Sequence, residues 1–151
     1  MRILFIDDQP DGHAPLIRTL REAFEDGEVA VADSLEAARE HLADGPWDVV
    51  VLDIFLPLTR RPEQPGRLAR KYEENVRHLG GLVILDDIAR MRDPPPVLGH
   101  SEASDPELLQ SIADHLVARV PKPASPAVLL RAILDVVLPP EPGGFPFPRD
   151  G

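Results

Sequence analysis

Five residues that could carry phosphoryl chemistry come directly after short apolar runs of the sequence. They are Asp7, Asp8, Asp53, Ser101 and Lys122. Three carboxylates gathered in one place repel one another, and such a group usually persists because a hard divalent cation takes their oxygens as ligands. An aspartate beside that cation can attack phosphorus, while the cation, a hydroxyl and an ammonium neutralise the oxygens of the transferred group. These residue types therefore predict a Mg²⁺-dependent phosphoryl site.

Lys122 stands out from the composition, because the chain has fourteen arginines and only two lysines. A compact ammonium suits a phosphoryl oxygen. Pro123 follows it, and a bond before proline can adopt the cis form that turns a chain sharply. Alone, Ser101 would be an ordinary turn hydroxyl and Lys122 a solvated charge. Only the set of five gives these two residues a predicted role.

The five residues meet only if the apolar runs are neighbouring strands that end at the same edge. Residues 3–6 and 49–52 are continuous apolar runs that end in aspartate, which is typical of parallel strands buried on both faces. Residues 96–100 and 117–120 indicate further strands, and residues 29–32 are a weaker candidate. We therefore predict a doubly wound α/β fold with a five-stranded parallel sheet, helices on both faces and a ligand site beyond the strand ends.

Helical periods separate these strands. Two apolar helix faces are indicated, one by Leu16, Ile17, Leu20 and Phe24, and one by Leu35, Ala38 and Leu42. We predict that the second helix begins with a capping box of Asp33 and Glu36, and that prolines after Asp105 and Ser125 begin two later helices. Another helix is expected after Gly80-Gly81, with Asp86 and Asp87 facing solvent.

Two segments interrupt the alternation of strands and helices. Residues 58–79 form an insertion after the third strand, and residues 139–151 form a tail with five of the eighteen prolines, predicted to be extended and mobile. The predicted domain therefore spans residues 1–138. In the insertion, one helical face would carry Leu68, Tyr72, Val76 and Leu79, beside the basic residues Arg67, Arg70, Lys71 and Arg77. Such a helix either packs on its own domain or docks an acidic partner.

Composition excludes several classes of function. The chain has no cysteine, so thiol catalysis, disulfides and cysteine-ligated zinc are excluded. Its formal net charge of −10 argues against general nucleic-acid binding. No apolar run is long enough to cross a membrane, and no signal peptide is indicated, so we expect a cytoplasmic location. The five histidines, His13, His41, His78, His100 and His115, show no metal-ligand spacing and are expected to be surface or core residues.

The runs at residues 3–8, 50–57 and 96–101, together with Lys122-Pro123, resemble response-regulator receiver domains of two-component systems. The resemblance covers residues 1–57 and 80–138 and implies the flavodoxin-like receiver fold in a single-domain form. It implies that Asp53 is the phosphoacceptor and that Asp8, Asp53 and the Phe55 carbonyl bind Mg²⁺ directly. It further implies that Asp7 acts through a water, and that Ser101 and Lys122 contact the phosphoryl group.

Two residues depart from the family pattern. Glu102 stands where a small residue usually follows the Ser or Thr, and Arg119 stands where an aromatic residue often reports activation. Both favour an alternative hypothesis, a pseudo-receiver that acts as a docking or dimerisation module without phosphorylation. A hydrolase of the haloacid-dehalogenase type is disfavoured, because neither Asp7 nor Asp53 has a second aspartate two positions later.

The favoured hypothesis is a phosphoacceptor signalling domain charged by a histidine kinase or a histidine phosphotransfer protein. It would be an enzyme only in the sense of self-phosphorylation and self-dephosphorylation. Because the sequence leaves no room for an output module, output would be protein–protein contact. The candidate surfaces for a homodimer or a protein partner are residues 58–79 and the final helix, whose six apolar residues are too many for one buried stripe.

Overall fold

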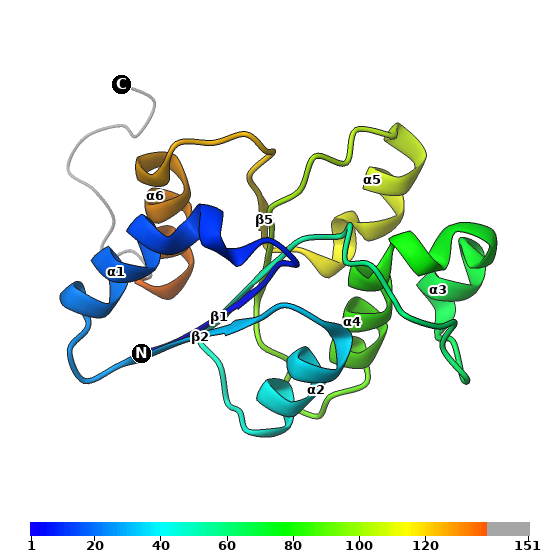
Figure 1. The fold of residues 1–151 in the computed structure, drawn as a ribbon, viewed down its shortest axis with the longest axis horizontal. Helices are drawn as coiled ribbons and strands as arrows, with labels where there is room; N and C mark the ends of the chain where they lie inside the picture. Colours follow the sequence, from blue (N-terminus) through cyan, green and yellow to red (C-terminus); the bar gives the residue numbers. More distant parts are fainter. Residues whose placement is uncertain (139–151) are drawn as a thin grey trace, which may run out of the picture.

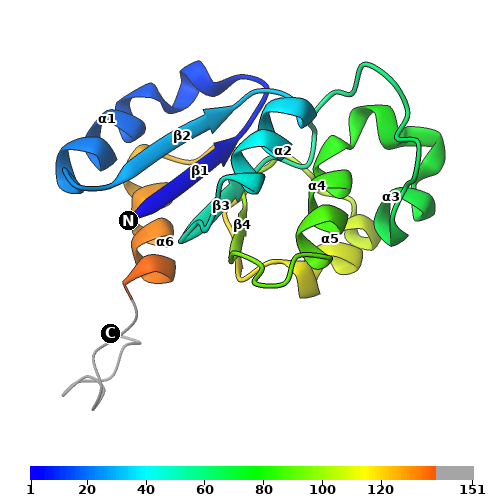
Figure 2. The same cartoon turned by 90° about the horizontal axis from the view of Figure 1, so that it is seen from below.

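The computed structural model describes residues 1–138, and the predicted tail at residues 139–151 lies outside this range. Its centre is a five-stranded parallel sheet with the strand order β2-β1-β3-β4-β5 (Figures 1 and 2). The strands are β1 (Arg2–Ile6), β2 (Glu28–Ala32), β3 (Val49–Leu52), β4 (Val97–Gly99) and β5 (Ala118–Arg119). The predicted fold class is confirmed, and all five predicted strands are present. The last two strands, β4 and β5, are each two residues shorter than the sequence indicated.

The sheet has a core on each face, because alternate residues of a strand point to opposite sides. Ile3 and Phe5 of β1 face one core, whereas Leu4 and Ile6 face the other. On the first side lie η1 (Pro10–His13), α1 (Ala14–Ala23) and α6 (Pro126–Val137). On the second side lie α2 (Leu35–Ala43), α4 (Gly80–Ala89) and α5 (Pro106–Ile112), which is followed by η3 (Ala113–His115).

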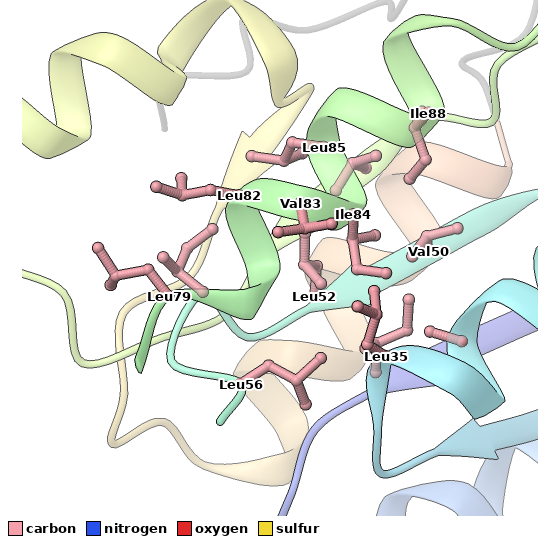
Figure 3. Packing of buried hydrophobic residues seen from close by; sticks show 14 of the residues in the cluster. Leu35, Val50, Leu52, Leu56, Leu79, Leu82, Val83, Ile84, Leu85 and Ile88 are labelled. Carbon is pink, nitrogen blue, oxygen red and sulfur yellow. The ribbon is translucent and has the colours of Figure 1, made fainter. Parts of the chain in front are cut away.

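Helix α4 forms the centre of the second core. Its first seven residues and Ile88 are buried, whereas Asp87 is partly exposed. The apolar side chains of α4 pack against Val50 and Leu52 of β3 (Figure 3). Gly80 and Gly81 let this helix begin against the chain that follows β3. A Cβ atom on Gly81 would come within 2.5 Å of the Ile54 Cα, so only glycine allows this approach.

Side-chain caps fix the starts of three helices. Asp105 accepts a hydrogen bond from the Leu108 N–H and Ser125 accepts one from the Val128 N–H, as the prolines after them predicted. The prediction that Asp33 and Glu36 form a capping box was wrong. The cap of α2 is Ser34, whose hydroxyl accepts from the Ala37 N–H at 3.1 Å, because the helix begins one residue later than the pattern suggested.

The insertion packs on its own domain. It holds two short helices, α3 (Arg67–Lys71) and η2 (Glu73–His78), so the single helix predicted for residues 67–79 is interrupted at Tyr72. The side chains of Leu68, Val76 and Leu79 are buried against the second core. The basic residues of α3 and η2 are exposed, and α3 lies on the outer side of α4 (Figures 1 and 2).

A buried carboxylate anchors this insertion. Asp86 of α4 is 6% exposed and accepts hydrogen bonds from the N–H groups of Leu68 and Ala69, both at 3.0 Å. The prediction that Asp86 faces solvent was therefore wrong, because the first turn of α3 leaves N–H groups that need an acceptor. The same prediction is closer to the structure for Asp87, because its side chain is partly exposed and pairs with Arg39 and Arg90. No helix within residues 1–138 is both long and apolar enough to cross a membrane.

Candidate functional site

The sheet register brings the predicted carboxylates together. Ile6 of β1 pairs with Leu52 of β3, so Asp7 and Asp53 leave neighbouring strands at the same level. The Asp53 N–H donates to the Ile6 carbonyl at 3.0 Å, which fixes the two strand ends side by side. Asp7, Asp8 and Asp53 each offer a carboxylate oxygen within 4.8 Å of the other two. Asp7 and Asp53 are only 2% and 7% exposed, so two of these charges lie out of solvent.

Lys122 joins the two buried carboxylates. Its Nζ donates to Asp7 Oδ2 at 2.7 Å and to Asp53 Oδ2 at 3.0 Å. The residue follows β5, where its N–H donates to the Ser101 carbonyl at 2.9 Å, and the Lys122–Pro123 peptide is cis, as the sequence allowed. Burial alone would lower the pKa of Lys122, but its hydrogen bonds with the two aspartates outweigh burial and raise it. The ammonium is therefore charged at neutral pH.

Asp7 is held as an anion by three donors. The Gln9 N–H donates to Oδ1 at 2.9 Å, while Oδ2 accepts from Lys122 and from His13 Nε2, the latter at 2.9 Å. Burial would raise the pKa of Asp7, but these hydrogen bonds together hold it well below its ordinary value. Asp7 therefore stays ionised although it is almost completely buried.

Asp8 shows the cost of bringing three carboxylates together. Its burial, followed by the charges of Asp7 and Asp53, raises its pKa above the ordinary value. An oxygen-binding divalent cation relieves this repulsion, and carboxylate oxygens are the donors that Mg²⁺ prefers. The donor set therefore fits the Mg²⁺ site that the sequence predicted.

Ser101 and Phe55 complete the set of predicted residues. Ser101 is buried at the end of β4, and its Oγ accepts from the Ala103 N–H at 3.0 Å. The Phe55 N–H donates to Asp53 Oδ1 at 2.9 Å, which holds the backbone of Phe55 beside the acceptor carboxylate. The Phe55 side chain is 39% exposed. The two residues that depart from the family pattern, Glu102 and Arg119, are exposed.

Two histidines, His13 and His100, border the site, and the sequence did not predict a role for them there. The rings of His13 and His100 stack in a tilted arrangement with centroids 5.4 Å apart, and His13 reaches Asp7. His100 Nδ1 donates to the Val120 carbonyl at 2.7 Å, and burial lowers the pKa of His100. Pro10 begins the turn of η1 that brings His13 back over β1. That proline, placed just after the acidic pair, was the one sequence signal for this contact.

Comparison with known proteins supports the fold. No protein-family model and no curated protein matches the sequence. The structure is similar to the signal receiver domain of a DNA-binding response regulator (merR) from Colwellia psychrerythraea 34H, with a TM-score of 0.65, 18% identity and coverage of 91% of this chain and 98% of that one. It is also similar to a CheY-like response regulator receiver domain protein from Methanospirillum hungatei JF-1, with a TM-score of 0.63, 19% identity and coverage of 90% and 92%.

A third similar structure is the N-terminal domain of an uncharacterized protein (WS1339) from Wolinella succinogenes, with a TM-score of 0.63, 25% identity and coverage of 90% of this chain and 93% of that one. The coverage shows that the likeness includes nearly the whole sheet and its helices. At these identities the likeness shows the fold alone. Residues 1–138 therefore have the receiver-domain fold, as the resemblance of the strand-end motifs implied.

Proposed function

We propose that this chain is a phosphoacceptor signalling domain in which Asp53 takes a phosphoryl group from a histidine kinase or a histidine phosphotransfer protein. One observation carries the proposal: Lys122 Nζ, from the end of β5, contacts both Asp7 and Asp53 at the ends of β1 and β3. An ammonium held over two buried carboxylates is suited to a site that must accept further negative charge. The receiver-domain fold supports the same function.

The residues suit Mg²⁺-assisted transfer. When bound, Mg²⁺ would be held by Asp8, Asp53 and the Phe55 carbonyl, with Asp7 acting through a water, and would supply positive charge opposite the phosphoryl oxygens. Asp53 is held by the Phe55 N–H on one oxygen and by Lys122 on the other. These two contacts orient the carboxylate before a donor arrives.

The transfer itself is a displacement at phosphorus. A carboxylate oxygen of Asp53 forms the new bond, the bond from phosphorus to the donor's imidazole nitrogen breaks, and its electron pair leaves with the imidazole. The Lys122 ammonium and the Ser101 hydroxyl then donate to phosphoryl oxygens. Water reverses the state by attacking phosphorus, which releases inorganic phosphate and restores the carboxylate. The catalysis we propose is limited to this self-phosphorylation and self-dephosphorylation.

The direct test is intact mass after incubation with acetyl phosphate, with and without Mg²⁺. We expect the addition of one phosphoryl group that requires Mg²⁺ and is abolished in Asp53→Asn, because an amide is not a nucleophilic carboxylate. Asp26→Asn is the matched control, since Asp26 is exposed in the turn before β2, at the other edge of the sheet. Labelling that persists in Asp53→Asn would assign the acceptor to another residue.

A second candidate function is a phosphorylation-independent pseudo-receiver that docks or dimerises. The observation that favours it is Glu102, whose charge directly follows Ser101 at the edge where negative charge is already crowded. The same mass measurement separates the two candidates, because a pseudo-receiver takes up no phosphoryl group at any Mg²⁺ concentration. Glu102→Ala then provides a sharper comparison, since it should speed labelling if Glu102 only repels the phosphodonor.

We propose that output occurs through protein contact at α6. Leu129 and Ile133 are buried on one side of this helix, but Val128 and the C-cap residue Leu138 are 54% and 53% exposed. Exposed apolar residues of this kind are typical of a contact surface for a protein partner or a second copy of the chain. Light scattering of the chain with and without acetyl phosphate tests self-association, and Val128→Asp should abolish any association through α6.

A further inference from the structure

A second polar pocket lies away from the strand-end carboxylates. It is open to solvent, has a volume of about 440 Å³ and is lined by α2, the end of α4 and the chain segment of residues 58–64. This size falls in the range of pockets for small molecules, which is roughly 300–1,000 Å³. None of the predicted site residues lines it. The pocket is therefore separate from the site proposed for Asp53.

Four arginines line this pocket in a chain whose formal net charge is −10. Arg39 comes from α2, Arg90 caps the end of α4, and Arg60 and Arg61 come from the insertion. Two carboxylates, Glu36 and Glu63, also line it. Cationic groups from three separate segments therefore converge on one hollow, and they outnumber the acidic groups in its wall.

The four guanidinium groups differ in how they are held. Asp87 accepts from Arg39 Nε at 2.8 Å and from Arg90 Nη2 at 2.6 Å, so this carboxylate fixes two of the groups in place. Arg60 and Arg61 make no side-chain hydrogen bond or ion pair with any residue in the range 1–138. They are therefore free to close on a ligand, while the fixed pair supplies a preorganised wall.

We propose that this pocket binds a small molecule that carries two or more linked phosphoryl groups. A guanidinium matches phosphate oxygens in a two-point contact, and several converging guanidiniums suit a ligand with anionic oxygens on more than one centre. A metal cation is disfavoured here, because the four guanidiniums outnumber the three carboxylates Glu36, Glu63 and Asp87. Leu35 and Leu58 provide a small apolar wall beside them, so the ligand need not be polar throughout. This site is independent of phosphoryl transfer to Asp53.

The test is isothermal titration of the chain with pyrophosphate in the absence of Mg²⁺. We expect saturable binding to one site, at least about tenfold tighter than binding of inorganic phosphate, because pyrophosphate offers anionic oxygens on two linked phosphorus centres and phosphate on only one. The double variant Arg60→Ala/Arg61→Ala should weaken pyrophosphate binding by about tenfold or more. Both arginines are exposed, so thermal unfolding of this variant should match that of the natural chain.

The matched control is Arg67→Ala/Arg70→Ala, which removes the same charge from exposed residues of the same insertion outside the pocket. Its pyrophosphate affinity should change by less than about twofold, an effect of charge alone. Equal losses in the two double variants would overturn the proposal, because binding would then follow net charge and not the pocket. Absence of saturable binding at millimolar pyrophosphate, or equal affinity for phosphate and pyrophosphate, would overturn it as well.

Discussion

Lys122 has two separable effects at the candidate site, one on stability and one on chemistry. It neutralises two carboxylates that are nearly inaccessible to solvent. In Lys122→Met the side chain stays unbranched and only one atom shorter but loses its charge, so Asp7 and Asp53 repel each other. We expect the free energy of unfolding to fall by about 1–3 kcal/mol without Mg²⁺, measured by urea denaturation. Addition of Mg²⁺ should recover part of this loss, because the cation replaces the missing positive charge.

The same variant tests the catalytic role. Labelling by acetyl phosphate should be slow in Lys122→Met even at saturating Mg²⁺, where the variant is folded. Lys71→Met is the control, because Lys71 is the other lysine of the chain and its Nζ contacts Ser111 of α5, away from the carboxylates. Normal labelling of Lys122→Met would restrict this lysine to a structural role.

His100 should make the stability of the protein fall in mild acid. Burial lowers its folded-state pKa, and the charges of His13 and Lys122 lower it further, which together outweigh the raising effects of the hydrogen bond with the Val120 carbonyl and of Asp7. Below a pH of about 6.5 the unfolded chain binds a proton on His100 that the folded chain does not. The free energy of unfolding should therefore decrease as pH falls, by at most about 1.4 kcal/mol per pH unit for this residue.

Urea denaturation between pH 8 and pH 5 measures this slope. His100→Asn should have the smaller slope even if loss of the Nδ1 contact with Val120 lowers its stability at pH 8. The exposed His78→Asn is the matched control and should keep the slope of the natural chain. A slope unchanged in His100→Asn would assign the acid sensitivity to other groups.

Residue types and their places at strand ends were enough to predict that the side chains of Asp7, Asp8, Asp53 and Lys122 meet. Parallel strands place their carboxyl ends at one edge, so the order of apolar runs fixed the positions of Asp7, Asp53, Ser101 and Lys122 without any knowledge of tertiary contacts. The contact of His13 with Asp7 could not be predicted in this way. It depends on the path of the four-residue turn η1, and short turns have no apolar period.

At the scale of elements, Asp86 joins the insertion to the rest of the fold. Its carboxylate accepts from two N–H groups of α3, which would otherwise be buried without an acceptor. We expect Asp86→Ala to lower the free energy of unfolding by about 2–4 kcal/mol, measured by urea denaturation. Asp87→Ala is the neighbouring control. Its carboxylate pairs with two arginines that are at least half exposed, so its loss should cost under about 1 kcal/mol.

For the insertion, the sequence pattern predicted which residues are buried but not how the helices are divided. Its apolar spacing correctly identified Leu68, Val76 and Leu79 as residues that pack inward. The pattern did not reveal the break at Tyr72, because the same spacing fits one long helix or two short ones. It also could not assign Asp86 to the interior, since a polar residue on an apolar helix is normally a solvent contact unless a distant segment supplies donors.

At the scale of the whole molecule, the single tryptophan reports on the edge of the sheet opposite to the candidate site. Trp47 precedes β3, whereas Asp53 follows it. The indole is 5% exposed, donates from Nε1 to the His41 carbonyl at 2.7 Å and lies under the Arg2 guanidinium, 4.1 Å from the ring centroid. It therefore contacts α2 and β1, and its fluorescence should change only when the domain unfolds.

Mg²⁺ should therefore raise the stability of the domain without changing the emission of folded Trp47. A ligand that binds only the folded state stabilises it in proportion to the logarithm of ligand concentration over the dissociation constant, so the urea midpoint followed by Trp47 should rise with millimolar Mg²⁺. Strong quenching of the folded protein by Mg²⁺ would instead place the ion near Trp47 and contradict the site.

The variant Asp8→Asn distinguishes the effect of Asp8 on Mg²⁺ binding from its effect on the stability of the fold, again by the urea midpoint. The folded-state pKa of Asp8 is raised, so its charged form is less favourable in the folded than in the unfolded chain, and this cost is present at neutral pH. Neutralising it should raise the urea midpoint in the absence of Mg²⁺. Because an amide is a weaker ligand for Mg²⁺, the further rise on adding Mg²⁺ should be smaller than in the natural chain. A variant that is less stable without Mg²⁺ yet responds normally to it would show that Asp8 supports the fold and not the metal.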